Sequence, residues 1–187
     1  MAIIIDSYSE SNCNWFDIPG NKNMGAYPYW GQSFTGNGQN LDKVKLYLSK
    51  EGSPTGSATV SIYAHSGEYG TTGIPTGNIL ATSDTFDISA LTESYQLVDF
   101  PFSGANRINL GDGTRYFLVI DCPDSSGNYV KIGIDTSSPT HGGNEAYYNN
   151  GWYYRAGTDM CFYVYGEDST TPIVGEKYPL PPFRRSV

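Results

Sequence analysis

The segment EAYYNNGWYY, residues 145–154, sets five aromatic rings around one Asn-Gly pair. Rings beside amide and acid groups suit a sugar, whose C–H faces stack on rings and whose hydroxyls need directional partners. Trp and Tyr also anchor protein interfaces, where they concentrate binding energy. A third interpretation is structural, because cross-strand aromatic pairs stabilise a hairpin by roughly 0.2–1 kcal/mol each. The residue types alone leave all three interpretations open.

An Asn-Gly pair between alternating segments predicts a two-residue hairpin turn, here at Asn150 and Gly151. The expected cross-strand pairs are Asn149 with Trp152, Tyr148 with Tyr153, and Tyr147 with Tyr154. Opposite residues share a face, so one face packs on the core and the other presents rings to solvent or to a partner. The candidate binding residues, for a sugar or a protein surface, are Tyr147, Asn149, Trp152 and Tyr154, joined by Tyr27, Tyr29 and Trp30 from NMGAYPYWG.

Motifs for catalysis do not occur in the sequence. There is no G-x-S-x-G nucleophile motif and no G-x-x-x-x-G-K phosphate-binding loop. The two histidines, His65 and His141, lie beside small residues, which favours turn-adjacent side chains with local hydrogen bonds. With 19 acidic residues some carboxylate pair is inevitable, so their number does not indicate a glycosidase. We therefore expect no catalytic residues and no enzymatic activity.

Cysteine and metal-ligand patterns are weak. Cys13, Cys122 and Cys161 show no C-x-x-C spacing, which argues against zinc. We expect buried, reduced thiols, with a Cys122–Cys161 disulfide as the alternative if their strands are neighbours. No cofactor is expected. A structural calcium ion is a weaker alternative, because the turn chemistry of DCPDSSGN explains its acids and amides equally well. The calcium candidates are Asp121, Asp124 and Asn128.

Composition favours an all-β domain. The chain has 187 residues, enough for one domain with terminal extensions. Its 16 tyrosines suit a pleated surface with one wet side, and its 22 glycines and 11 prolines suit frequent turns.

Charge and hydropathy exclude several partners. The net charge is −8, and no basic cluster precedes FRR near the C-terminus, so nucleic acid is not an expected partner. No apolar run approaches the roughly 20 residues that span a bilayer, so no membrane insertion is expected. The start MAIIIDSYSESN lacks the basic and long hydrophobic regions of a signal peptide, so we expect a chain used without export.

Hydrophobic alternation with a period of two recurs along the chain and predicts strands. In residues 41–49 the buried face is Val44, Leu46 and Leu48. The pattern predicts an antiparallel β-sandwich of jelly-roll type with extended N- and C-terminal arms. The expected strands are 32–36, 41–49, 58–65, 78–84, 94–102, 115–122, 128–135, the 145–154 hairpin and 160–166.

The termini differ from the body of the chain. We divide it into an N-terminal strand and aromatic loop (1–29), a β-sandwich domain (30–166) and a Pro-rich C-terminal arm (167–187). The arm is either a solvated tail or an extended assembly segment that binds a neighbouring surface. Its candidate anchors are Ile173, Val174, Tyr178, Leu180 and Phe183.

Four segments of the sandwich domain carry a family resemblance: GQSFTGNGQNLDKVKLYLSKEGSPTGSATVSIYAHSG, PTGNILATSD, GIDTSSPTHGGN and DMCFYVYG. They resemble a non-catalytic β-sandwich module of bacterial, archaeal, phage and metagenomic sequences, called choice-of-anchor in surface proteins. Stand-alone copies look like small phage virion proteins. The resemblance covers about residues 30–166, and it implies display or attachment with no catalytic residues.

The resulting functional expectation is a non-enzymatic structural or attachment protein. It would be a phage virion component, of capsid-decoration or fibre type, that contacts neighbouring subunits through its terminal arms and forms a homo-oligomer. Its expected location is the virion, with the cell surface as the alternative. The rival function is a carbohydrate-binding module that uses the Trp and Tyr residues named above.

Overall fold

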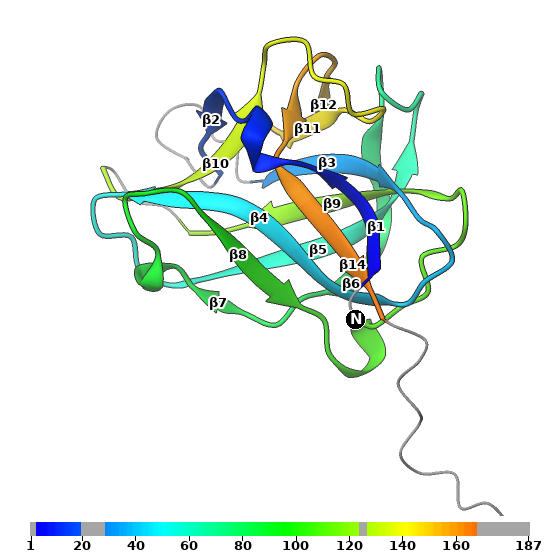
Figure 1. Ribbon diagram of the computed structural model, residues 1–187, viewed down its shortest axis with the longest axis horizontal. Coiled ribbons are helices and arrows are strands. Elements are labelled where there is room, and N and C mark those ends of the chain that lie inside the picture. The colour runs from blue at the N-terminus through cyan, green and yellow to red at the C-terminus, as the bar shows by residue number, and fades with distance from the viewer. Residues whose placement is uncertain (1–2, 20–28, 124–126, 168–187) are drawn as a thin grey trace, which may run out of the picture.

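The computed structural model describes residues 3–19, 29–123 and 127–167, which form two packed sheets (Figure 1). Sheet 1 contains β1 (Ile3–Tyr8), β2 (Trp15–Asp17), β4 (Leu41–Glu51), β8 (Gln96–Pro101), β10 (Tyr129–Asp135), β13 (Asp159–Met160) and β14 (Phe162–Gly166). Sheet 2 contains β3 (Tyr29–Thr35), β5 (Ser57–Ser66), β6 (Ile74–Thr82), β7 (Phe86–Asp87), β9 (Arg115–Asp121), β11 (Glu145–Tyr148) and β12 (Trp152–Arg155). The connections between these strands contain the 3-10 turns η1 (Glu10–Asn12), η2 (Ile88–Ala90) and η3 (Gly104–Asn106).

The strand order follows from the backbone pairing. Sheet 1 runs β1-β14-β4-β10-β13, with β8 also beside β4 and β2 beside β10. Sheet 2 runs β12-β11-β3-β9-β5-β6, with β7 beside β5. Every strand pair among them is antiparallel, so the predicted antiparallel β-sandwich is confirmed, while its jelly-roll connectivity stays a prediction. In the described part of the chain, no helix is long and apolar enough to cross a bilayer.

The core between the sheets follows the alternation of the sequence. Val44, Leu46 and Leu48 of β4 are fully buried and belong to the core cluster, as predicted. Val60 and Ile62 of β5 face them from sheet 2. Burying one such aliphatic side chain stabilises the fold by about 1.5–3 kcal/mol relative to leaving it exposed.

Strand β9 is buried on both faces. Leu118 and Ile120 point into the core between the sheets. Phe117 and Val119 point the other way and, with Ala146 of β11, form a second buried cluster on the outer side of sheet 2. The outer side of this sheet is therefore partly covered by side chains, which accounts for some of the aromatic residues in the sequence.

The first residues of the chain are built into sheet 1. Strand β1 pairs with β14, and β2 pairs with β10. Residues 3–17, which the sequence-based division assigns to a separate N-terminal segment, therefore supply two strands of the sandwich. Ile3 lies opposite Gly166, so both ends of the sandwich meet at one point (Figure 1).

Candidate functional site

The β11–β12 hairpin has a three-residue loop at 149–151, and the predicted two-residue turn is wrong. A type I′ turn needs positive φ at both central residues, and of the two only Asn150 has it, at 53°. Pairing of Ala146 with Gly31 of β3 also fixes β11 from outside the hairpin. The cross-strand pairs are Tyr148 with Trp152, Tyr147 with Tyr153, and Ala146 with Tyr154.

The corrected register divides the predicted binding residues between two faces, because a one-residue slip turns one strand over relative to the other. Tyr147 packs on the core side, with its ring centroid 5.3 Å from that of Trp30. Trp152 lies on the outer side, where it packs with Tyr29 over the second buried cluster. Tyr154, on the face of Trp152, is exposed, Asn149 lies in the loop, and Tyr27 lies outside the described residues.

Four rings on the outer side of sheet 2 form what we call the outer aromatic cluster: Tyr29, Tyr63, Tyr148 and Trp152. Trp152 is at its centre, with ring centroids 5.5 Å from Tyr148 and 6.5 Å from both Tyr29 and Tyr63. These edge-on and tilted contacts are stabilising geometries for aromatic pairs. The next two residues, Tyr153 and Tyr154, are 50% and 53% exposed. They are the rings that the hairpin leaves to solvent.

Arg155 anchors the base of the hairpin to the opposite sheet. Its Nη1 contacts Asp17 of β2 and lies 3.1 Å from Glu145 Oε2, and its guanidinium lies 5.3 Å from the Trp30 ring centroid. Glu145 is fully buried. Burial, followed by the charge of Asp17, raises the pKa of Glu145 well above its usual range. The Arg155 side chain therefore connects Asp17 of sheet 1 to Glu145 of sheet 2.

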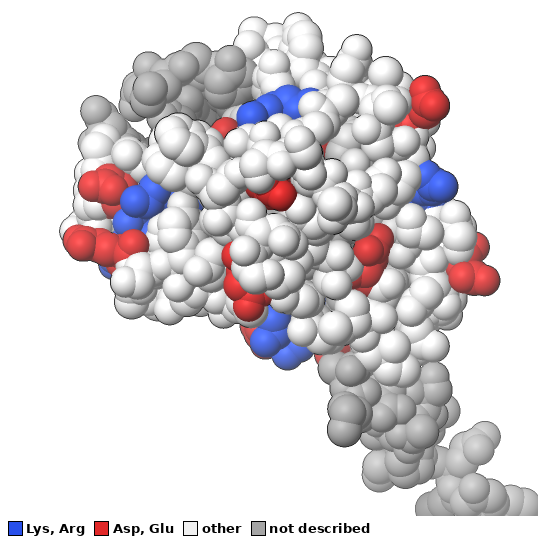
Figure 2. Space-filling model, turned by 45° about the horizontal axis from the view of Figure 1, so that its top comes forward, with Lys and Arg blue, Asp and Glu red and all other residues white. Residues whose placement is uncertain are grey.

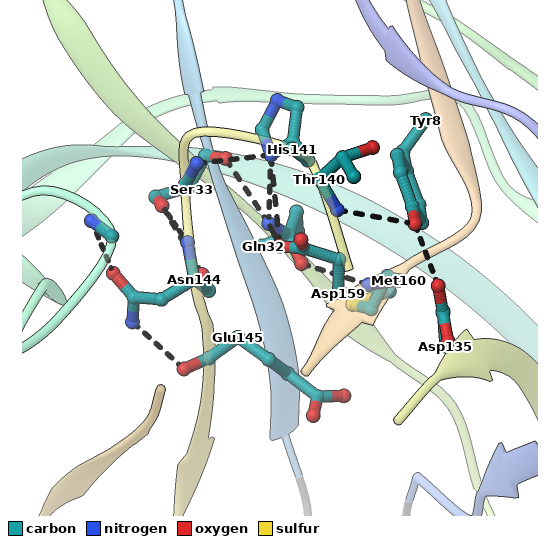
Figure 3. A network of polar contacts seen from close by, with 12 residues as sticks. Tyr8, Gln32, Ser33, Asp135, Thr140, His141, Asn144, Glu145, Asp159 and Met160 are labelled. Atoms are coloured by element: carbon teal, nitrogen blue, oxygen red, sulfur yellow. Dashed lines mark hydrogen bonds and ion pairs between the residues drawn. The ribbon is translucent and has the colours of Figure 1, made fainter. Parts of the chain in front are cut away.

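His141 lies in a buried polar network that joins β1, β3 and β13 (Figure 3). Its side chain is 8% exposed, with Nε2 3.2 Å from an Asp6 oxygen and Nδ1 3.6 Å from an Asp159 oxygen. Burial alone would lower the pKa of His141, but the interactions with Asp159 and Asp6 raise it to about 9. The Gly143 amide points at Nδ1 from 3.1 Å, which favours a neutral ring. We assign a protonated ring, because otherwise two carboxylates would lie beside it without a countercharge.

The contacts around His141 are those of a structural network. Ser33 Oγ accepts a hydrogen bond from the Asn144 amide and donates one to the Asn144 carbonyl, so it is not directed at the imidazole. Over the described ranges, neither His141 nor His65 hydrogen-bonds to a Ser, Thr or Cys side chain. The network instead ties the 136–144 segment to the strands on either side of it.

The candidates for calcium and for a disulfide have ordinary structural partners. Asn128 Oδ1 accepts a hydrogen bond from the Ser53 amide, and Asp124 lies outside the described residues. Asp121 is exposed at the end of β9, opposite Tyr29 and Thr59, so the calcium site stays a prediction. None of the three cysteines forms a disulfide, and Cys122 and Cys161 are buried as expected, whereas Cys13 is half-buried. The thiol beside Cys161 is that of Cys13, while Cys122 lies in the core between the sheets.

Comparison with known proteins adds no relative: no protein-family model matches this chain, and no curated protein is similar to it. The resemblance to choice-of-anchor modules therefore stays a prediction, and the geometry of the molecule is the main evidence for its function. That geometry contains residues that the sequence did not single out, above all Arg155, Asp17 and Glu145. Their one visible signal is an acid and a base at the two ends of EAYYNNGWYYR.

Proposed function

We propose that this protein is a non-enzymatic attachment protein, a structural component of a phage virion, in which copies of the chain bind one another through the exposed rings of the β11–β12 hairpin. The observation that carries the proposal is the exposure of Tyr153 and Tyr154, about half of each side chain. The two lie on opposite faces of the hairpin. Aromatic residues of this kind concentrate binding energy at protein interfaces.

The hairpin is held in place before any partner arrives. Strand β11 pairs with β3, Arg155 contacts Asp17 of the other sheet, and Tyr153 stacks on Tyr147 at 5.6 Å. Rings that are already ordered lose little conformational entropy on binding, which favours affinity. Figure 2 shows acidic and basic side chains in small separate groups spread over one face of the molecule, with uncharged surface between them.

The family resemblance supports the virion part of the proposal, because it implies display or attachment. A sugar is less favoured at this hairpin. Stacking on a sugar needs an open ring face, and Trp152 instead packs among Tyr29, Tyr63 and Tyr148. The hairpin geometry therefore suits protein contact better than the rival carbohydrate function.

Light scattering on the full chain tests self-association. We expect a dimer or larger assembly. The double variant Tyr153→Ser, Tyr154→Ser should raise its dissociation constant by at least about tenfold. Leu97→Ser is the matched control, since Leu97 is 37% exposed on β8 of the other sheet. A wild-type chain that stays monomeric at every concentration, or a double variant that assembles like wild type, contradicts the proposal.

A chain ending at Gly166 tests the arm predicted from the sequence, whose residues 168–187 lie outside the described structure. If the hairpin is the interface, this chain assembles like the full one. If only the truncated chain becomes monomeric, the interface belongs to the arm, and the hairpin assignment is incorrect although the attachment role survives.

A further inference from the structure

A second aromatic surface lies on the outer side of sheet 1, away from the hairpin. Tyr47 of β4 alternates with the core residues Leu46 and Leu48, so it points outward. Together with residues of η1, β2 and the segment before β8, it lines an open groove of about 460 Å³. That volume is in the range of small-molecule sites. The lining residues used below are Glu10, Asn14, Trp15, Phe16, Tyr47 and Tyr95.

The rings of the groove form two parallel pairs. Trp15 and Phe16 lie 5.7 Å apart with an interplanar angle of 11°, and Tyr47 and Tyr95 lie 5.0 Å apart at 26°. Trp15 is 61% exposed, the highest value among the large hydrophobic side chains of the described residues. Because Trp15 is not packed into the core, its ring and the three rings beside it present a flat apolar surface to solvent.

Polar groups complete the lining. Glu10 accepts a hydrogen bond from the Tyr163 hydroxyl, which lowers the pKa of this carboxylate and keeps it ionised as an acceptor. Burial raises the pKa of Tyr95 to about 12, so its hydroxyl remains a donor. The Tyr95 hydroxyl oxygen is enclosed beside the Ser49 hydroxyl, so Tyr95 offers its ring to the groove and not its hydroxyl.

The charges around the groove restrict its ligand. The Glu10 carboxylate and the net charge of −8 repel anions. Lys131 already occupies the cation-binding position of Phe16, with Nζ 5.4 Å from the ring centroid, and it is paired with Glu51 at 3.0 Å. A second cation there would be repelled. Flat rings, an acceptor carboxylate and the Asn14 amide then favour an uncharged ligand rich in hydroxyl groups.

We propose that the groove of sheet 1 is a saccharide-binding site, in which a neutral sugar stacks on Trp15 and Tyr47 and hydrogen-bonds to Glu10 and Asn14. This site is separate from the hairpin in sequence and lies on the other sheet. The inference therefore does not depend on self-association through Tyr153 and Tyr154. Together the two sites would let one face of the molecule attach to its assembly while the other binds a glycan.

Titration calorimetry and Trp fluorescence with β-1,4-linked tetramers of glucose and of N-acetylglucosamine test the site. We expect at least one tetramer to bind the full chain and Trp15→Ala to raise the dissociation constant by about tenfold or more, while Tyr95→Phe, which keeps the ring and removes only the enclosed hydroxyl, should bind like wild type. Trp152→Ala, on the opposite sheet, is the matched control and should bind like wild type. Thermal melts confirm that Trp15→Ala remains folded, as its exposure predicts.

Three results would overturn the inference. The first is that neither tetramer binds. The second is that Trp152→Ala abolishes binding while Trp15→Ala does not, which would place the sugar site at the hairpin. The third is that tetramethylammonium binds and the sugars do not, which would make the groove a cation-binding site. The Tyr153→Ser and Tyr154→Ser double variant separates the two proposals, because it should lose self-association and keep sugar binding.

Discussion

Replacing His141 with alanine lowers the free energy of unfolding by about 3–5 kcal/mol, the usual effect of removing one partner of a buried ion pair. The reason is that Asp6 and Asp159 then both lose the cation that lies beside them. Asp159 has only 2% of its side chain exposed, so water cannot take the place of the imidazole. Denaturant unfolding at neutral pH measures the loss.

The same residue gives wild type a characteristic pH dependence. The folded-state pKa of His141, about 9, exceeds the ordinary value of 6.5, so its stabilisation is complete below about pH 6.5 and is lost as the pH rises through 9. A shift of that size corresponds to about 3 kcal/mol. Glu145 acts in the same direction, because its pKa is also raised. We expect melting temperatures to fall from neutral pH to pH 10.

His141→Ala should flatten this alkaline slope. The control is Lys43→Ala, which removes an exposed ion pair with Asp99 and should cost no more than about 1 kcal/mol with no change of slope. An alkaline slope as steep in His141→Ala as in wild type would show that His141 is neutral in the folded protein, as the Gly143 contact favours, and that other groups cause the slope.

Arg155→Met destabilises the protein by about 3 kcal/mol or more, because it leaves Asp17 and the fully buried Glu145 without their shared cation. The hairpin also loses its connection to sheet 1, so the near-ultraviolet circular dichroism of Trp30, which lies beneath the guanidinium, should change. Thermal and urea unfolding measure the stability.

Two further variants isolate the charge effect. Adding Asp17→Asn to Arg155→Met removes the carboxylate that has lost its cation and should restore part of the stability. Lys131→Met matches Arg155→Met chemically, but its partner Glu51 is mostly exposed, so its effect should stay below about 1 kcal/mol. If Arg155→Met and Lys131→Met cost the same, the Arg155 cluster does not hold the sheets together.

The fold was predictable from the sequence because its signals are local. Alternation in residues 41–49 identified β4 and its buried face, and similar runs identified β5, β9, β10 and β14. The hairpin register did not follow the Asn-Gly preference, since Gly151 lacks the positive φ that a type I′ turn requires. The pairing of β11 with β3 was not predictable either, because it joins Ala146 to Gly31, more than a hundred residues away.

The sites were less predictable than the fold, because their members come from distant positions. Asp6, His141 and Asp159 meet only when β1, the 136–144 segment and β13 are assembled. Likewise, Trp15 and Tyr95 are eighty positions apart, and each looks like an ordinary aromatic residue in the sequence. The densest run of rings in the sequence is not the most exposed one, because Trp152 and Tyr147 pack against the two buried clusters.

Because Ile3 and Gly166 lie opposite each other on paired strands, the polypeptide enters and leaves the sandwich at the same corner. A polypeptide that enters and leaves a domain at one corner can be spliced into a surface loop of a host protein without stretching that loop. The hairpin and the groove both lie on other elements, so such a graft would leave them open. An engineered or natural protein could thus carry this sandwich as an internal insert rather than as a terminal fusion.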